Sequence, residues 1–183
     1  MYAPEMKPET SLPPGVEVRR AAAEEQTIMM NLLQLYAHDF SEFIDLQLQP
    51  DGRFGDPDLS RYWGEEGRIP FLVRVDGHLA GCALVSRGSR ISADPRVWDM
   101  AEFFVVRRYR KRGIGAAAAH EIWRRFPGPW EVRVLESNQP ARAFWRAAIR
   151  AIAPSMAEGR MMEMQGNRWE VFSFVSPQTP ATE

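Results

Sequence analysis

Apolar and polar positions in the first half of the chain predict a strand, a helix and a hairpin. Val16 to Arg20 is a candidate short strand, and Glu24 to Tyr36 carries apolar residues at the spacing of an amphipathic helix. Phe71 to Val75 and Leu79 to Ser86 are predicted strands, because the hairpin-turn signal Asp76-Gly77 separates them. This half of the chain therefore supplies antiparallel strands.

The segments around these elements are less regular. Phe40 to Leu48 is expected to form a second, shorter helix that Ser41 caps. Gln49 to Gly67 is rich in Gly, Asp and Arg, which predicts a loop containing about one helical turn. Gly88 to Pro95 is a second polar turn, and it leads into the next apolar segment.

The second half alternates strands with helices. Trp98 to Val106 is a nearly continuous apolar run, as is typical of a strand covered on both faces. The elements expected after it are a helix, a strand, a helix and a strand, at Gly113 to Phe126, Trp130 to Leu135, Pro140 to Ile149 and Trp169 to Val175. This order predicts a mixed sheet with helices packed on it, an α/β or α+β layered domain.

The length of 183 residues fits one domain with a substantial core. Residues 1–14 contain four prolines and little apolar material, so we expect a disordered leader before a domain at residues 15–176. Residues 177–183 are similar in character and are expected to form a flexible tail. No repeat or linker divides the segment between them.

Composition and charge argue against several classes of function. A net charge of −1 does not favour a protein that coats nucleic acid or an anionic membrane, and no apolar run approaches the length of a membrane span. Cys82 is the only cysteine, and the histidines form no HExxH pair, so we expect neither a disulfide nor a bound metal. Pro and Glu stand where a signal peptide needs an apolar segment, which favours the cytoplasm.

The run from Val105 to Gly115, which joins the long apolar strand to a helix, carries the strongest chemical signal. Gly113 and Gly115 let the backbone come close to a ligand, and the helix start offers free N–H groups to an anion. Five of the six residues from Arg107 to Arg112 are basic. Together these features predict a phosphate-bearing ligand at the start of the helix.

Other interpretations of this loop stay open. Basic runs also occur in nucleic-acid patches and solvated turns, although this one abuts a GxG at a helix start in a near-neutral chain. A P-loop needs Gly-Lys-Ser/Thr, whereas alanines follow Gly115. A dinucleotide-binding fold fits Gly113-Ile114-Gly115 with Ala118 and Glu136. Against it, an arginine-rich turn separates these glycines from the strand, and the unit begins only past residue 95.

Two motifs resemble the GNAT superfamily of acyl-CoA-dependent N-acetyltransferases. The first is Arg/Gln-x-x-Gly-x-Gly/Ala, which Arg110, Gly113 and Gly115 match, with Val105 as the apolar strand residue five positions upstream. The second, Asn-x-x-Ala-x-x-aliphatic-Tyr, is echoed at Asn138, Ala141, Phe144 and Trp145. One helix and one strand are expected between the motifs, as in the family, and the match covers about residues 98–149.

The resemblance implies a single GNAT-like domain, whose mixed, mostly antiparallel sheet has a central parallel strand pair and helices on both faces. It implies transfer of an acetyl group from acetyl-CoA to an amine. Backbone N–H groups of the glycine motif would hold the pyrophosphate, and the preceding strand would pair with the pantetheine arm and polarise the thioester carbonyl. The implied binding residues are Phe104, Val105, Val106, Arg110, Lys111, Arg112, Gly113, Ile114, Gly115, Ala116, Asn138 and Trp145. A homodimer is plausible from the habit of the family.

Attack of an amine on a thioester asks for a base, because an amine is mostly protonated at neutral pH. Glu102 is the only charge in the apolar strand Met100 to Val106, and burial would raise its pKa towards neutrality. A buried carboxylate paired with an arginine explains Glu102 equally well. Strand alternation groups Glu102 with Phe104 and Val106, without indicating which face they share. The substitutes for the base are Asp99, His38, Asp39 and Glu136.

The family usually protonates the departing thiolate with a tyrosine, and here Trp145 stands at that position. An indole N–H is no usable acid, so we expect Trp145 to serve as packing. A thiol pKa of about 8.5 lets the thiolate leave with help from water alone. Spacing supports none of the other phenols, Tyr36, Tyr62 and Tyr109. This departure motivates an alternative, a non-catalytic acyl-CoA-binding or sensing module; an NAD(P)-dependent enzyme is the weaker alternative.

The acceptor site is expected at the first helices and the loop after them, as the resemblance implies. Aromatic and acidic side chains in this part of the chain would suit a cationic amine, although core roles compete with that function. They are Tyr36, His38, Asp39, Phe43, Tyr62 and Trp63. The sequence does not identify the amine.

Overall fold

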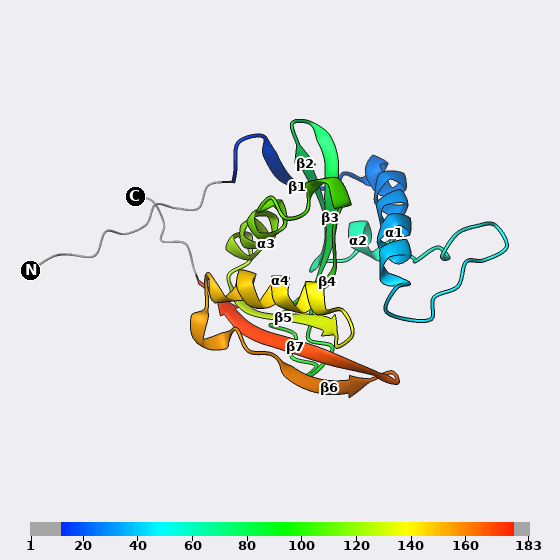
Figure 1. The fold of residues 1–183 in the computed structure, drawn as a ribbon. Coiled ribbons are helices and arrows are strands. Elements are labelled where there is room, and N and C mark those ends of the chain that lie inside the picture. The colour runs from blue at the N-terminus through cyan, green and yellow to red at the C-terminus, as the bar shows by residue number, and fades with distance from the viewer. Residues whose placement is uncertain (1–11, 178–183) are drawn as a thin grey trace, which may run out of the picture.

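A computed structural model describes residues 12–177 of the chain. Within them, seven strands form one mixed sheet in the order β1-β2-β3-β4-β5-β7-β6. Helices lie on both faces of this sheet (Figure 1). The leader expected at residues 1–14 and the tail expected at residues 177–183 fall almost entirely outside the described residues.

Antiparallel strands make up the first half of the sheet. Asp76 and Gly77, with φ angles of 50° and 77°, form the tight hairpin turn that the sequence predicts. The strands are β1 (Val16–Arg20), β2 (Arg68–Val75), β3 (His78–Arg87) and β4 (Trp98–Val105). One edge of β4 is therefore paired along the strand with β3.

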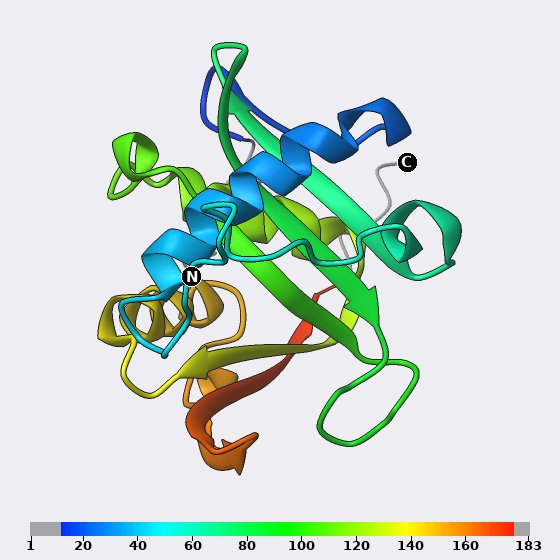
Figure 2. The same cartoon turned by 90° about the vertical axis from the view of Figure 1, so that its right-hand side faces the viewer.

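The other edge of β4 faces β5 (Gly128–Leu135), and these two strands are parallel. They pair at only two positions, where Trp98 lies opposite Trp130 and Asp99 lies opposite Glu131. Beyond these positions the strands diverge (Figure 2). On its far side β5 remains paired with β7 (Asn167–Ser176), which also pairs with the edge strand β6 (Arg160–Met164). The divergence opens the middle of the sheet.

Two hydrophobic cores lie on opposite faces of the sheet. On one face, Ile122 of α3 and Ile149 of α4 are fully buried against the sheet. On the other, Met29 and Leu32 of α1 pack against β2, β3 and β4. The helices are α1 (Gln26–Phe40), α2 (Arg61–Gly64), α3 (Ile114–Arg125) and α4 (Gln139–Arg150), and the 3-10 turns are η1 (Ala23–Glu25), η2 (Arg107–Tyr109) and η3 (Pro154–Met156).

Most predicted elements are confirmed within a few residues, but the helix predicted at Phe40 to Leu48 is wrong. Helix α1 continues to Phe40, and residues 41–48 form turns and irregular chain. Ser41 ends the first helix instead of starting another. Its backbone N–H donates to the Ala37 carbonyl and its hydroxyl to the His38 carbonyl, so it satisfies the last carbonyls of α1.

Strand β6 is not predicted from the sequence. The strand carries Met161, Met162 and Met164, and all three remain partly exposed because an edge strand has a neighbour on one side only. The signal for this hairpin is the turn that follows. Gln165 and Gly166 have φ angles of 52° and 75°, as a two-residue hairpin loop requires.

A β-bulge in β4 decides which face Glu102 occupies. The pairing with β3 skips Ala101, so Met100 and Glu102 lie on opposite faces although they are two residues apart. Met100 belongs to the core beneath α3 and α4, whereas Glu102 shares the face of α1 with Phe104 and Val106. The predicted grouping of these three residues is confirmed, and their face is the one that α1 covers.

Candidate active site

The glycine loop, Arg110–Gly115, follows β4 and the turn η2 and ends in the first residues of α3. Gly113 is the N-cap of α3 with a φ angle of 77°, and Lys111 also has a positive φ, at 58°. A Cβ atom at Gly113 would meet nothing within 4 Å. Glycine is therefore required here by the backbone conformation, and it leaves the first N–H groups of α3 without a covering side chain.

Two arginines around this loop are engaged by α1. Arg107 donates two hydrogen bonds to Asp39 Oδ1, at 3.0 and 2.6 Å, and Arg110 donates to Asp39 Oδ2. The Nε of Arg110 also donates to the Val105 carbonyl, at 2.6 Å. Partial burial raises the pKa of Asp39, but the bonds from both arginines outweigh burial and hold that pKa below its usual value. Two of the five basic side chains are therefore already paired.

The backbone of β4 presents its free groups towards β5. The Val106 N–H donates to the Ala80 carbonyl at 2.8 Å, and the Phe104 carbonyl faces Gly81, where an added Cβ would meet it at 2.2 Å. Alternation along a strand then directs the N–H of Val105 to the opposite edge, where β5 has diverged. Of the predicted strand positions, Val105 is the one whose N–H faces the gap.

A cavity of about 470 Å³, here called the loop cavity, lies between the glycine loop, the end of β4 and the starts of α3 and α4. The predicted binding residues that line it are Phe104, Val105, Arg110, Lys111, Gly113, Gly115, Ala116, Asn138 and Trp145. Val106, Arg112 and Ile114 do not line it. The Val106 N–H is held by the sheet, Arg112 is exposed, and the Ile114 side chain is buried in the core.

The start of α4 forms the far wall of the loop cavity. Asn138 caps this helix, because its Oδ1 accepts a hydrogen bond from the Ala141 N–H at 3.0 Å. Gly115 faces the Phe144 ring, which a Cβ atom would approach to 3.2 Å. The second glycine of the motif therefore keeps α3 close to α4.

Trp145 is a packed aromatic residue with a relative exposure of 6%. Its ring centroid lies 5.0 Å from that of Phe103, 4.8 Å from that of Phe144 and 5.9 Å from that of Trp123. The contacts with Phe103 and Phe144 are edge-to-face, and such contacts stabilise a core. Phe103 and Phe144 also line the cavity, and alternation on β4 was the available signal for Phe103.

Glu102 is partly buried under α1, and the Tyr36 phenol on that helix is close enough to act on its carboxyl as a hydrogen-bond donor. Burial raises the pKa of the Glu102 carboxyl. The hydrogen bond from Tyr36 and the charges of Arg90 and Arg133 oppose burial without cancelling it. The direction of this shift agrees with the sequence expectation and suits a group that must accept a proton near neutral pH.

The substitutes for the base have other environments. Asp99 is fully buried and paired with Arg133 at 3.0 Å and Arg90 at 3.4 Å, which gives it a structural role. Glu136 forms a surface pair with Arg168 at 3.2 Å, and the His38 side chain is 71% exposed. Neither of these two residues lines the loop cavity, and Asp39, which does, is occupied by Arg107 and Arg110.

The expected acceptor residues are split between the cavity and the core. Tyr36, Asp39 and Phe43 line the loop cavity, together with two residues that the sequence analysis did not single out, Phe40 and Glu42. The others do not line it: His38 is exposed, Tyr62 is buried, and the Trp63 indole donates to the Ala21 carbonyl. The end of α1 is thus the part that reaches the cavity.

A family model described as the acetyltransferase (GNAT) family matches residues 29–148, a span that contains most of α1, the glycine loop and most of α4. The chain belongs to this family. It is an acetyltransferase of the GNAT type, as its two motifs imply. No curated protein matches the sequence.

Solved structures show the GNAT fold along nearly the whole chain. Spermidine N-acetyltransferase from Vibrio cholerae, in complex with CoA and spermine, has a TM-score of 0.63 and 10% identity, over 88% of this chain and 96% of that one. The ribosomal-protein-S18-alanine N-acetyltransferase from Escherichia coli has a TM-score of 0.60 and 10% identity, over 92% and 99%. A GNAT family acetyltransferase from Elizabethkingia anophelis with acetyl-CoA bound has a TM-score of 0.55 and 12% identity, over 89% and 99%.

The dinucleotide-binding interpretation of the glycine motif is wrong. Such a fold is built on a mostly parallel sheet, whereas in this GNAT protein the pair β4–β5 is parallel and every other pairing is antiparallel within the described residues. The motif instead lies where the sheet divides, which is where the GNAT sequence pattern expects it.

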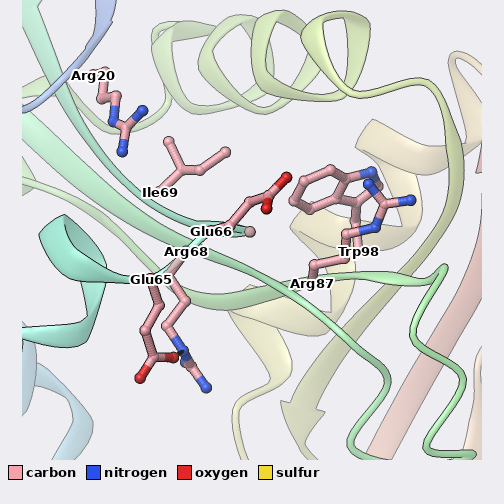
Figure 3. A pocket seen from close by; sticks show the side chains of 8 residues that line it. Arg20, Glu65, Glu66, Arg68, Ile69, Arg87 and Trp98 are labelled. Atoms are coloured by element: carbon pink, nitrogen blue, oxygen red, sulfur yellow. Dashed lines mark hydrogen bonds and ion pairs between the residues drawn. The ribbon is translucent and has the colours of Figure 1, made fainter.

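The GNAT domain has a second cavity, here called the distal cavity, at the start of β4. Its volume is about 510 Å³, and its lining residues are Arg20, Glu65, Glu66, Gly67, Arg68, Ile69, Arg87 and Trp98. Arg68 and Glu65 lie side by side, paired at 3.0 Å, while the Glu66 carboxylate points towards the Trp98 indole (Figure 3). The Arg87 guanidinium lies 5.0 Å from the Trp98 ring centroid.

Two further findings concern the described residues as a set. Residues 12–177 contain no cluster of three or more His, Cys, Asp or Glu side chains arranged to hold a metal ion. In the same range, none of the helices has the length and apolar character needed to cross a bilayer.

Cys82 is buried in the core beneath α1, and burial raises the pKa of its thiol, as expected for a packing residue.

Proposed function

We propose that this protein transfers an acetyl group from acetyl-CoA to an amine by direct attack, with Glu102 as the general base. The observation that carries the proposal is the loop cavity, which lies where β4 and β5 part and has the glycine loop along its rim. Uncovered N–H groups at the start of α3 suit an anion such as the CoA pyrophosphate.

The donor would lie across the gap in the sheet. The free edge of β4 offers backbone groups to the amide-bearing pantetheine arm, as an added strand would. At the end of this edge the Val105 N–H is a fixed donor for the thioester carbonyl, whose oxygen gains negative charge as the amine attacks. Asn138 and Phe144 support the opposite side of the arm.

The chemistry needs one proton removed from the ammonium form of the acceptor. Glu102 accepts it, the neutral amine attacks the carbonyl carbon, and the carbon–sulfur bond breaks with its electron pair leaving on sulfur. A second nitrogen-bound proton passes to water as the amide forms. The leaving thiolate needs no tyrosine at position 145, because a thiol pKa of about 8.5 makes it a tolerable leaving group in water.

Ligand binding is tested by thermal shift with acetyl-CoA, CoA and NADPH. At 100 times its dissociation constant a ligand stabilises the folded state by about 2.7 kcal/mol, which raises the Tm of a domain of this size by roughly 5–10 °C. We expect this shift with acetyl-CoA and CoA and none with NADPH. Absence of a Tm shift with acetyl-CoA would contradict the central proposal.

A second candidate function, a non-catalytic acyl-CoA-binding module, is favoured by one observation. Trp145 fills the position of the usual tyrosine and is packed among aromatic rings. Both functions predict CoA binding, so thiol release decides between them. The enzyme releases free CoA thiol when acetyl-CoA meets a panel of primary amines that includes polyamines and peptide N-termini. Persistent absence of release with intact binding would favour the module.

Glu102 is tested by the isosteric change Glu102→Gln. General base catalysis contributes about 10²–10⁴-fold to a rate, so turnover is expected to fall at least 100-fold while acetyl-CoA affinity is retained. Glu136→Gln, at a surface pair outside the cavity, is the matched control. An unchanged rate in Glu102→Gln would remove Glu102 from the mechanism.

A further inference from the structure

Tyr36 forms part of the wall of the loop cavity and also interacts with Glu102. Among the described residues, Tyr36 lines the cavity and Glu102 does not. The Tyr36 phenol lies close enough to the Glu102 carboxylate to act on its pKa as a hydrogen-bond donor. Tyr36 therefore occupies the boundary between the loop cavity and Glu102, which is the position that a proton relay from the cavity would require.

The Tyr36 ring is held from several sides. Its centroid lies 5.4 Å from that of Phe40, one turn later on α1, and 6.0 Å from that of Phe104 on β4. The same end of α1 is fastened to the region of the glycine loop, because Asp39 binds both Arg107 and Arg110. These contacts keep the phenol oriented relative to the loop and to β4.

We propose that the Tyr36 hydroxyl is a catalytic proton relay between the acceptor amine and the Glu102 carboxylate. This inference rests on the proposed function. In the relay step the N–H bond of the ammonium breaks and an O–H bond forms at the Tyr36 oxygen. The original O–H bond of Tyr36 breaks, and its proton forms a new O–H bond on Glu102. The products are a neutral amine, a neutral tyrosine and a protonated Glu102, which later returns its proton to water.

The environment of Tyr36 suits a relay better than an independent acid. Burial, followed by the negative charge of Glu102 and the hydrogen bond to it, raises the pKa of the Tyr36 phenol well above its usual value. A phenolate is therefore disfavoured, and the hydroxyl accepts one proton only as it gives up another. Tyr36 supplies no proton of its own to the thiolate, so the relay does not replace the tyrosine missing at position 145.

Several charged or titratable groups face Glu102 from the elements packed around it. They are Tyr36 from α1, Tyr62 from α2, Cys82 from β3, Asp99 from β4, Arg133 from β5 and Arg90 from the loop between β3 and β4. Burial raises the pKa values of Cys82 and Tyr62, so both remain neutral, and Asp99 forms ion pairs with both arginines. Glu102 is the carboxyl of this group whose pKa is raised by burial.

The test compares variants of the full chain in the thiol-release assay, with acetyl-CoA and an accepted amine. Tyr36→Phe removes the relay and keeps the ring, Glu102→Gln removes its end point, and the double variant removes both. Tyr62→Phe is the matched control, because it removes another buried phenol from the same core. Circular dichroism and acetyl-CoA thermal shift establish that each variant folds and binds the donor.

We expect Tyr36→Phe to lower kcat at least tenfold, with the KM for acetyl-CoA changed less than threefold, since general acid–base steps contribute about 10²–10⁴-fold. Residues of one relay are not additive, so the double variant should be no slower than the slower single variant. Tyr36→Phe turnover within twofold of the parent, or multiplicative losses in the double variant, would overturn the relay while leaving acetyl transfer intact. Absence of thiol release in the parent protein would instead overturn the proposed function and the relay with it.

The pH profile separates a relay from a purely structural phenol. Burial raises the pKa of Glu102, and the hydrogen bond from Tyr36 partly opposes this rise. Loss of that hydrogen bond therefore raises the pKa of Glu102 further. The base must be deprotonated, and the acidic limb of kcat/KM is therefore expected to move to higher pH in Tyr36→Phe. In Tyr62→Phe this limb should stay in place. An unmoved limb in Tyr36→Phe would show that the phenol does not act on Glu102.

Discussion

The two cavities of this protein are similar in volume, about 470 and 510 Å³, and lie near opposite ends of β4. The walls of the loop cavity are aromatic rings, a glycine-containing backbone loop and a helix start, at the point where two strands separate. The walls of the distal cavity are mostly long charged side chains, and Glu65 is paired there with Arg68.

The two cavities differ in the chemistry of their walls and not in volume, so wall chemistry decides which of them suits a ligand. Arginine and glutamate side chains rotate freely and partly satisfy each other, so they hold no fixed pattern of donors. Backbone N–H groups at the start of α3 and along β4 are fixed by the fold, and an acyl transfer needs donors that are already in position. We expect acetyl-CoA affinity and thiol release to depend on the residues of the loop cavity and not on those of the distal cavity.

The largest effect is expected from Gly113→Val, which attacks the loop cavity at its rim. Valine at a φ angle of 77° is strained by about 1–2 kcal/mol, and the strain would distort the N–H groups that precede α3. Acetyl-CoA affinity, measured by calorimetry, should fall at least tenfold, which is about 1.4 kcal/mol. Gly166→Val is the control, because Gly166 has nearly the same φ angle, 75°, in the β6–β7 turn. Equal losses in both variants would refute a local role.

A smaller effect is expected from Trp145→Phe, which tests whether the aromatic wall of the loop cavity is packing. The smaller ring leaves space among Phe103, Trp123 and Phe144, and stability measured by denaturant unfolding should fall by about 1–3 kcal/mol. Turnover should remain well above that of Glu102→Gln. If it fell to the level of that variant, the indole would have a chemical role.

The smallest effect is expected in the distal cavity. Arg20 and Glu66 are exposed, and within residues 12–177 neither side chain forms a hydrogen bond or ion pair. Arg20→Ala and Glu66→Gln should each change stability by no more than about 0.5 kcal/mol and leave acetyl-CoA affinity and thiol release unchanged. A clear change in either measurement would break the contrast between the two cavities and identify the distal cavity as a second working site.

Much of the fold follows from local sequence. The Asp76-Gly77 turn, the apolar run of β4 and the glycines before α3 each act within a few residues, so their elements are predicted. The features that were not predicted correctly depend on information beyond the local sequence pattern. Ser41 ends α1 through bonds to carbonyls behind it, although its position also fits the start of a helix. The divergence of β4 from β5 depends on pairing between strands, which no single segment encodes.

The site divides in the same way. The glycine motif and Asn138 were found because neighbouring residues define them, and both line the loop cavity. Contacts across long stretches of chain were not predictable. Asp39 meets Arg110 across 71 positions of sequence, and Tyr36 meets Glu102 from a different element. The sequence therefore indicated the donor loop and a candidate base, but not the helix end that joins them.

The bulge at Ala101 gives one residue an unusual influence over this protein. Ala101 comes two positions after Asp99, the last residue of β4 that pairs with β5, and a bulge bends its strand and strengthens its twist. Loss of the Ala101 codon would keep every later side chain of β4 on its present face, yet it would straighten the strand and let β4 continue alongside β5. We therefore expect a variant that lacks Ala101 to lose the opening between β4 and β5, and with it the acetyltransferase activity.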